Sequence, residues 1–311
     1  MTGTMDHTEQ TARIGPTERG EPAGQAEEAA AELAAHRPML FGLAYRMLGS
    51  AHDAEDVLQD AYLRWIRVDR PTVAEPRRYL SRMVTRLAVD QLRARQATRE
   101  TYVGQWLPEP VSTGPVTCEP FDAAAHRDSL SIAMLHLLER LTRPERAVFI
   151  MRTAFELPYT EIAETLDRSV PDCRQLYHRA TERVGTDQAR FTTDRGTQER
   201  LLAAFVSATR NGDLAELARM LATDATAWSD GGGKVRSALR PIVGADRVAR
   251  FFVGIFARNR SELSVEPAEI NGLPGIITRY GGSTRALTVA IRDGKIQHVY
   301  SITNPDKVLY L

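Results

Sequence analysis

The spacing of apolar residues changes along the chain, and this change constrains the fold more than any other feature. From Leu33 to about residue 97, and again over residues 129–184, apolar side chains recur every three or four positions, as in amphipathic helices. Beyond residue 197, helical spacing mixes with alternating runs typical of strands. The expected helices lie near residues 198–209, 214–221 and 245–257, and the expected strands near 263–270, 275–280, 286–291 and 296–302. Helices followed by an antiparallel meander predict an α+β domain.

Several boundaries divide the chain of 311 residues, which has room for two or three domains. Residues 1–30 carry almost no large apolar side chain, so we expect a disordered tail. Prolines and glycines interrupt the helical spacing over residues 101–128, which predicts a linker. The predicted domains are therefore an all-α domain at 31–100, a second all-α domain at 129–190 and the α+β domain at 197–311.

Charge is balanced over the whole chain, with 40 basic and 40 acidic residues, but it is segregated locally. Residues 53–60 are acidic and residues 77–99 are rich in arginine, which predicts surfaces for two different partners. The two cysteines, Cys118 and Cys173, lie far apart, which argues against a disulfide framework and a metal cluster. With no apolar run long enough to span a bilayer and no export signal, we expect a cytoplasmic protein without membrane contact, cofactor or metal.

A helix-turn-helix pattern lies at residues 157–180. A first short apolar stripe is followed by Ser169 and Asp172, which are suited to cap a second helix. Upstream, Thr142 and Glu145 form a capping-box pattern that predicts another helix start. The second helix would present Arg174, Gln175, Tyr177, His178 and Arg179, and Arg and Gln side chains can pair with base edges in the major groove. The alternative is an ordinary solvated helix.

The arginine-rich segment at residues 77–95 is also helical in spacing. Its guanidinium groups could follow phosphates, while Tyr79 and Thr85 could touch unstacked bases. A basic helix face that is merely solvated remains the alternative.

Residues 40–65 and 76–93 together resemble region two of extracytoplasmic-function (ECF) RNA polymerase sigma factors, and residues 129–184 resemble region four of that family. The resemblance implies a partner for each surface. The acidic segment would dock on the clamp of core RNA polymerase, the arginine-rich helix would open and read the minus-ten promoter element, and the helix from Val170 would read the minus-thirty-five element. The implied polymerase contacts are Asp53, Glu55, Asp56, Gln59, Asp60 and Trp65, and the implied minus-ten contacts are Arg78, Tyr79, Arg82, Thr85, Arg86 and Arg93.

The linker at residues 102–111 and two short motifs narrow the resemblance. The motifs are DGGGK at residues 230–234 and NPDK at residues 304–307. All three resemble ECF sigma factors with a C-terminal SnoaL-like extension, whose fold is a cone related to nuclear transport factor 2 (NTF2). This cone could hold a small-molecule ligand in its pocket.

We expect the extension to regulate the sigma factor by packing on its DNA-binding domains or linker, so that no separate anti-sigma factor is required. Covalent tethering favours such contacts, because it gives an effective concentration on the order of millimolar. The expected interdomain residues are Trp106, Leu107, Pro108, Asp230, Gly231, Gly232, Gly233, Lys234, Asn304, Pro305, Asp306 and Lys307.

Two other readings remain open from the residues alone. One is a helix-turn-helix regulator with a ligand-sensing domain, which would bind duplex DNA without polymerase. The other makes the last domain a hydrolase or isomerase, in which Asp230 or His298 would act as general base and Tyr280 or Trp228 as donors. Because no spacing among these four residues shows a shared orientation, we predict no catalytic residue.

Overall fold

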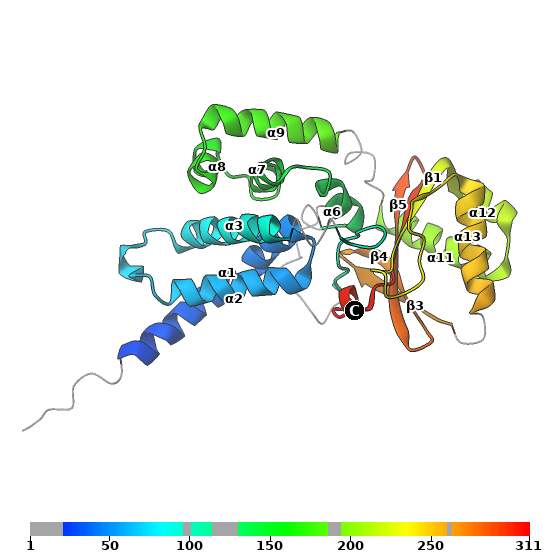
Figure 1. The fold of residues 1–311 in the computed structure, drawn as a ribbon, viewed down its shortest axis with the longest axis horizontal. Coiled ribbons are helices and arrows are strands. Elements are labelled where there is room, and N and C mark those ends of the chain that lie inside the picture. Colours follow the sequence, from blue (N-terminus) through cyan, green and yellow to red (C-terminus); the bar gives the residue numbers. More distant parts are fainter. Residues whose placement is uncertain (1–20, 96–100, 114–129, 186–193, 260–262) are drawn as a thin grey trace, which may run out of the picture.

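The computed structural model describes residues 21–95, 101–113, 130–185, 194–259 and 263–311. Two helical domains are followed by a domain of helices and one six-stranded sheet (Figure 1). The first domain contains α1 (Glu21–Leu48), α2 (Ala51–Trp65), η1 (Arg70–Thr72) and α3 (Pro76–Ala94). The second contains α6 (Ile132–Leu138), α7 (Arg143–Thr153), α8 (Tyr159–Leu166) and α9 (Val170–Val184). Multidomain architecture with two all-α domains before an α+β domain agrees with the fold class predicted from sequence.

The first helix begins earlier than the sequence indicated. The prediction of disorder is wrong for residues 21–30, because α1 starts at Glu21; residues 1–20 lie outside the described residues. This part of α1 is rich in alanine and glutamate, which are strong helix formers. Tertiary contacts add to that propensity, since Ala29 is buried and the guanidinium of Arg70 pairs with Glu28 and Glu32.

Local signals place the helices of the second domain where the sequence predicted them. Glu145 accepts a hydrogen bond from the Thr142 amide (3.0 Å), which completes the capping box of α7. Ser169 accepts from the amide of Asp172 (3.2 Å) at the start of α9. Between α8 and α9 the chain turns through Asp167, which has a left-handed backbone. The helix-turn-helix is therefore confirmed as a structural unit.

The C-terminal domain combines three helices with a mixed sheet. Its elements are α11 (Arg195–Asn211), α12 (Leu214–Met220), β1 (Leu221–Asp230), β2 (Ile242–Val243), α13 (Ala245–Arg258), β3 (Ser264–Ile270), β4 (Leu273–Tyr280), β5 (Ser283–Arg292), β6 (Lys295–Ile302) and η3 (Pro305–Lys307). The strand order is β2-β1-β6-β5-β4-β3. The meander β3 to β6 is antiparallel as expected, and Asn271 and Asp293 have the positive φ that their hairpins need.

Strand β1 is absent from the sequence prediction. It pairs parallel with β6 in the middle of the sheet, so the sheet is mixed rather than a plain meander. Its sequence is dominated by Ala, Thr, Asp and Ser, several of which are disfavoured in strands. Pairing on both edges, rather than local propensity, places this segment in the sheet.

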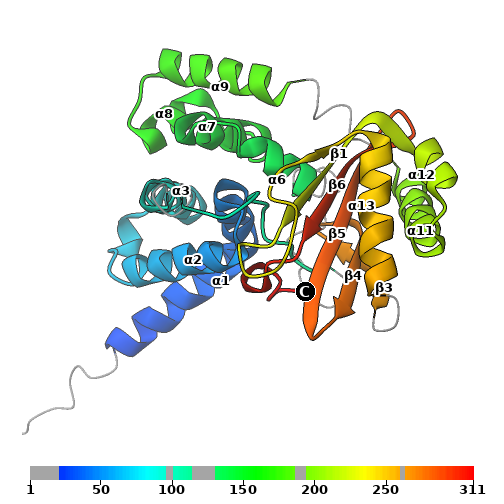
Figure 2. The same ribbon diagram turned by 45° about the vertical axis from the view of Figure 1, so that its right-hand side comes forward.

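Both faces of the sheet are covered, each by a different part of the chain. Ala227 belongs to the core formed with α11, α12 and α13, whereas its neighbour Trp228 belongs to a second core with Ile132 of α6 and Leu107 of the linker. This alternation is the period of two expected of a strand. Figures 1 and 2 show α11 and α13 on one side of the strands and α6 on the other. The second helical domain is thus packed directly on the C-terminal sheet.

No helix in the described ranges is both long enough and apolar enough to cross a lipid bilayer.

Candidate nucleic-acid interface

Helix α3 turns its arginines toward the acidic side chains of α8. The Nε atom of Arg78 lies 3.2 Å from Oε2 of Glu161, and a terminal nitrogen of Arg82 lies 2.5 Å from Oε2 of Glu164. Arg78 also reaches Glu164, at 3.4 Å. Two carboxylates of the helix-turn-helix therefore contact guanidinium groups that were expected to contact promoter DNA.

Arg86 extends this contact with hydrogen bonds to main-chain atoms. Its Nε donates to the carbonyl of Thr165 (3.0 Å), and a terminal nitrogen donates to the carbonyl of Glu164 (3.1 Å). These carbonyls belong to the last turn of α8, where helix carbonyls lack helical partners and attract cations. Figures 1 and 2 both show α8 beside α3. The arginine-rich surface of α3 is thus partly covered by the second helical domain.

The other residues of α3 that were expected to contact the minus-ten element differ in their exposure to solvent. Arg93 is exposed and pairs with Asp90 on its own helix (2.8 Å). Tyr79 is 37% exposed and packs against Trp65, with ring centroids 5.5 Å apart. Thr85 is buried, and its hydroxyl donates to the carbonyl of Ser81 (2.8 Å). The prediction that Thr85 touches bases is therefore wrong for this arrangement, because helical period placed it on the core side of α3.

Helix α9 presents most of the side chains predicted for base reading. Arg174, Gln175 and His178 are exposed, as their positions on the polar face of an amphipathic helix require. Tyr177 instead lies partly buried and stacks on Phe149 of α7, with centroids 6.1 Å apart. The exposed face of α9 is thus free of the contact with α3 that covers α8.

Arg179, also on α9, is held by an acidic residue of its own domain. Its Nε pairs with Glu145 at 3.2 Å, and Arg183 pairs with the same carboxylate at 2.5 Å. Burial would raise the pKa of Glu145, but hydrogen bonds from Thr142, followed by the pairing with these arginines, keep that pKa below its ordinary value. The pairing ties α9 to α7.

The acidic helix α2 separates into a buried and an exposed face. Asp56, Gln59 and Asp60 are exposed, whereas Glu55 is half-buried and pairs with Arg37 at 2.6 Å. This exposed acidic face is available to a partner.

Two expected contact residues of α2 are internal instead. Trp65 is fully buried in the core of the first domain, and Asp53 is buried in an ion pair with Arg95. The prediction that Asp53 and Trp65 contact a partner is wrong for this arrangement. The acidic composition of the segment did not distinguish the inner face of the helix from its outer face.

A buried charge pair joins the C-terminal domain to the linker. Lys307 Nζ lies 2.7 Å from the carboxylate of Asp230 and donates to the carbonyl of Leu107 (2.6 Å). The carboxylate also accepts hydrogen bonds from the Leu107 amide (2.9 Å), from the hydroxyl of Tyr102 and from the Gly232 amide (3.1 Å). Burial lowers the pKa of Lys307 to about 8 although Asp230 opposes the shift, and burial followed by the Asp230 hydrogen bond raises the pKa of Tyr102. The linker therefore supplies three of the groups that satisfy this pair.

The glycine turn after Asp230 allows the two C-terminal motifs to meet. A side chain at Gly232, which has φ +59°, would place its Cβ 2.3 Å from the side-chain nitrogen of Asn304. Lys234 then pairs with Asp306 across the same turn (2.6 Å). The DGGGK and NPDK segments are thus adjacent. Gly231, Gly233 and Pro305 belong to the same two segments.

Linker residues also contact both neighbouring domains. The ring of Trp106 lies 3.3 Å from Lys307 Nζ. Three residues later, the Glu109 carboxylate accepts from the amide of Ala51 (2.8 Å) at the start of α2, and its own amide donates to the carbonyl of Gly49 (2.8 Å). Pro108 lies between these contacts, beside Gly49. The linker is therefore fixed to the first domain at one end of α2 and to the C-terminal domain by its aromatic residues.

Asn271 connects more parts of the chain than any residue predicted from sequence. It is fully buried, and its side-chain nitrogen donates to the Tyr45 hydroxyl in α1 (2.7 Å) and to the Leu130 carbonyl next to α6 (2.8 Å). Its side-chain oxygen accepts from the amide of Val111 in the linker (3.0 Å). The Asn271-Gly272 pair is a sequence signal for a tight hairpin turn. Nothing in such a pair reveals burial between domains.

The four residues considered for catalysis do not share a cavity. Asp230 is neutralised by Lys307, and Trp228 and His298 pack on each other at 4.7 Å in the face of the sheet that contacts α6. Tyr280 lies instead beneath the guanidinium of Arg285, 3.4 Å from the ring centroid. In the described residues no group of three His, Cys, Asp or Glu side chains is placed to hold a metal ion.

The class that this arrangement defines is a two-domain DNA-binding initiation factor with an appended α+β domain. The sequence matches Sigma-70 region 2 over residues 33–98 and Sigma-70 region 4 over residues 131–184. The ECF RNA polymerase sigma factor SigJ of Mycobacterium tuberculosis is 35% identical over 287 residues, covering 89% of this chain and 92% of SigJ. The chain therefore belongs to the ECF RNA polymerase sigma factor family.

One solved structure agrees with this assignment over most of the chain. The crystal structure of M. tuberculosis SigJ superposes with a TM-score of 0.73 and 34% identity, covering 89% of this chain and 97% of that chain. A further similarity is to an NTF2-like protein of Burkholderia xenovorans LB400, with a TM-score of 0.28 and 13% identity over 38% of this chain and 96% of that one. The protein is thus a transcription initiation factor of the sigma factor family, and its C-terminal part is an α+β domain.

Proposed function

We propose that the arrangement described above is a closed form of the sigma factor, held by its own C-terminal domain and opened when core RNA polymerase binds. The observation that carries this proposal is the contact between α3 and α8. Arg78, Arg82 and Arg86 cannot follow promoter phosphates while Glu161 and Glu164 occupy them. Because carboxylates and phosphates compete for the same guanidinium donors, region 2 and promoter DNA would exclude each other in this form.

The C-terminal domain supports the closed form by contacting regions 2 and 4 simultaneously. Asn271 bonds to region 2 through Tyr45 and to the start of region 4 through Leu130. The sheet face carrying Trp228 packs on Ile132 of α6. A tethered domain with these contacts takes the place that a separate anti-sigma factor would occupy, so we propose that none is required.

The polymerase-binding surface is the exposed face of α2. It comprises Glu55, Asp56, Gln59 and Asp60, which are at least partly accessible in the closed form. Polymerase can therefore bind before the domains separate. Once they separate, Arg78, Tyr79, Arg82, Arg86 and Arg93 would contact the minus-ten element, and Arg174, Gln175, His178 and Arg179 the minus-thirty-five element. Since its partners are RNA polymerase and chromosomal DNA, we place the protein in the cytoplasm.

Substitution of Asn271 tests whether the C-terminal domain holds the closed form. Asn271→Gly keeps a residue that tolerates positive φ but removes the three side-chain hydrogen bonds to Tyr45, Leu130 and Val111. We expect this variant to raise run-off transcription severalfold at limiting sigma factor with purified core polymerase. Deleting the whole domain is less informative, because it would expose Leu107 and Ile132.

Asp293→Gly is the matched control. Asp293 also has positive φ in a hairpin, but it is exposed and belongs to none of the hydrophobic cores. We expect its transcription to equal that of the wild type. Equal output from the Asn271→Gly and Asp293→Gly variants would refute control by the C-terminal domain, and absence of any promoter-dependent transcription would refute the sigma-factor function itself.

A further inference from the structure

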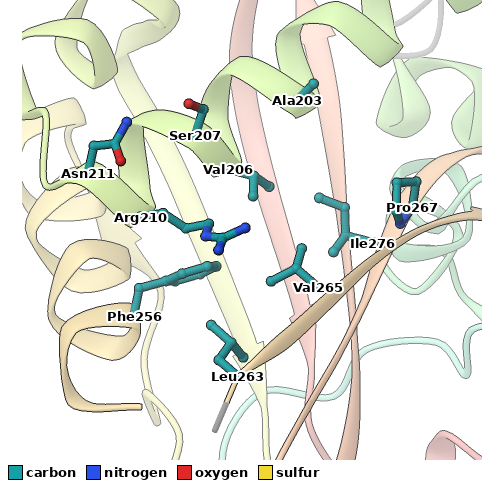
Figure 3. A pocket seen from close by; sticks show the side chains of 10 residues that line it. All are labelled: Ala203, Val206, Ser207, Arg210, Asn211, Phe256, Leu263, Val265, Pro267 and Ile276. Carbon is teal, nitrogen blue, oxygen red and sulfur yellow. The ribbon is translucent and has the colours of Figure 1, made fainter. Parts of the chain in front are cut away.

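A cavity of about 480 Å³ opens on the helix-covered side of the C-terminal sheet, away from the interface with regions 2 and 4. Its walls come from α11, the end of α13 and strands β3 and β4 (Figure 3). Small-molecule sites typically occupy about 300–1,000 Å³, so this volume suffices for a small organic ligand. None of the four residues considered for catalysis lines it.

The lining divides into an apolar wall and a polar edge. Phe256, Leu263, Val265 and Ile276 form much of the apolar wall, and Phe256 and Ile276 are largely buried. The polar edge belongs to α11, where Ser207, Arg210 and Asn211 follow at helical spacing. Such a division suits a molecule with an apolar body and one polar end.

Arg210 gives the polar end its charge. In Figure 3 its side chain extends into the space between Phe256 and Val265. Arg210 is exposed, so its guanidinium lies at the solvent-facing edge of the cavity, and none of the lining residues is acidic. A cation in the last turn of a helix also interacts favourably with the helix dipole, but that interaction does not require the side chain to lie over the cavity beside Phe256.

We infer that this cavity binds a carboxylate with an apolar chain. The chain would lie against Phe256, Val265 and Ile276, and the carboxylate would take two parallel hydrogen bonds from Arg210, the geometry in which guanidinium and carboxylate match. Because the cavity lies on the opposite side of the sheet from α6, binding does not depend on the closed form or on polymerase.

Calorimetric titration of the full chain with decanoate tests the inference, with decanol as a neutral probe of equal chain length. We expect decanoate to bind at least tenfold more tightly than decanol. Arg210→Gln should lower decanoate affinity about tenfold or more and leave decanol unchanged, whereas Arg210→Lys, which keeps the charge but loses the paired hydrogen bonds, should give an affinity between those of Arg210→Gln and the wild type. Circular dichroism melting shows whether each variant is folded.

Arg247→Gln serves as the matched control, because Arg247 is an exposed arginine of α13 outside the cavity. Its decanoate affinity should equal that of the wild type. Absence of decanoate binding, equal affinity for decanoate and decanol, or an equal loss in the Arg210→Gln and Arg247→Gln variants would each overturn the inference. None of these outcomes bears on transcription, which is measured without either probe.

Discussion

Single residues decide how the three domains are held together, and the sequence revealed only some of them. The DGGGK and NPDK segments were recognised as interdomain residues, and they do meet the linker through Asp230 and Lys307. Asn271 was missed, since its importance comes from three partners distant in the chain. Trp65 was likewise expected on the polymerase-binding surface of α2, but it is buried in the core of the first domain. Residue type predicts chemistry, whereas partner and exposure are set by tertiary packing.

His136 gives the interface between region 4 and the C-terminal domain a dependence on pH. It packs against both Trp228 and Tyr300, with ring centroids 5.2 and 5.6 Å away. Burial, and then the charge of Arg140, lower its pKa from 6.5 to about 4, although Glu139 opposes the shift. The unfolded chain therefore takes up a proton as pH falls below 6.5, while the folded chain does so only near pH 4.

The folded state should accordingly lose stability between pH 6.5 and pH 4. We expect His136 to account for about 2 kcal/mol of the stability lost from pH 7 to pH 5, a contribution that His136→Phe removes. Urea unfolding at both pH values measures it. The exposed His178, changed to Gln, is the control; an acid-induced loss that is identical in the His136→Phe variant and the wild type would contradict the prediction.

At the level of elements, the sequence predicted most helices and the meander strands well. It did not predict elements whose presence or position depends on tertiary contacts. Helix α1 extends ten residues beyond its expected start, and β1 was not predicted at all. The alternating strands β5 and β6 were found because their apolar pattern is local. Nothing local could show that α8 lies against α3, since that contact joins residues about 80 positions apart.

The contact between α8 and α3 predicts a gain of DNA binding. Changing Glu161 and Glu164 together to Gln removes the carboxylates that pair with Arg78 and Arg82. Exposed ion pairs contribute little each, so we expect free sigma factor to bind single-stranded minus-ten DNA about threefold to tenfold more tightly. Fluorescence anisotropy measures this. With Glu216→Gln on α12 as control, unchanged affinity in the double variant would contradict masking of α3.

The exposed face of α9 predicts a loss of binding confined to the other promoter element. Arg174→Ala or Gln175→Ala should weaken binding to duplex minus-thirty-five DNA by roughly 1–3 kcal/mol, the range of a good base contact. Binding to single-stranded minus-ten DNA serves as the internal control and should not change, because α9 and α3 present separate surfaces. A similar loss for both DNA molecules would instead indicate damage to the fold.

At the scale of the whole molecule, the sequence predicted the parts and their order but not their arrangement. The expected packing of the extension on the linker and the DNA-binding domains is found in the structure, through Tyr102, Leu107 and Asn271. The use of both sheet faces was not foreseen, because alternation in a strand shows that two faces exist without showing what covers each. The result is a molecule in which the C-terminal domain contacts every other described part.

This arrangement accounts for a sigma factor that would be silent when free. The proposed polymerase-binding face of α2 is exposed while the arginines of α3 are partly covered, so under this proposal polymerase binds before DNA. This proposed order of binding follows from the two surfaces: polymerase would use the exposed face of α2, whereas promoter DNA would use arginines of α3 that α8 partly covers.

The distance between region 2 and region 4 tests this central claim most directly. Arg93 and Arg168 line one cleft between α3 and the helix-turn-helix, so cysteines at these positions can carry spin labels. Cys118 would first be changed to Ser, and the buried Cys173 left in place. We predict a short interlabel distance in the free chain that lengthens when core polymerase binds. A distance that is the same with and without polymerase would contradict the account.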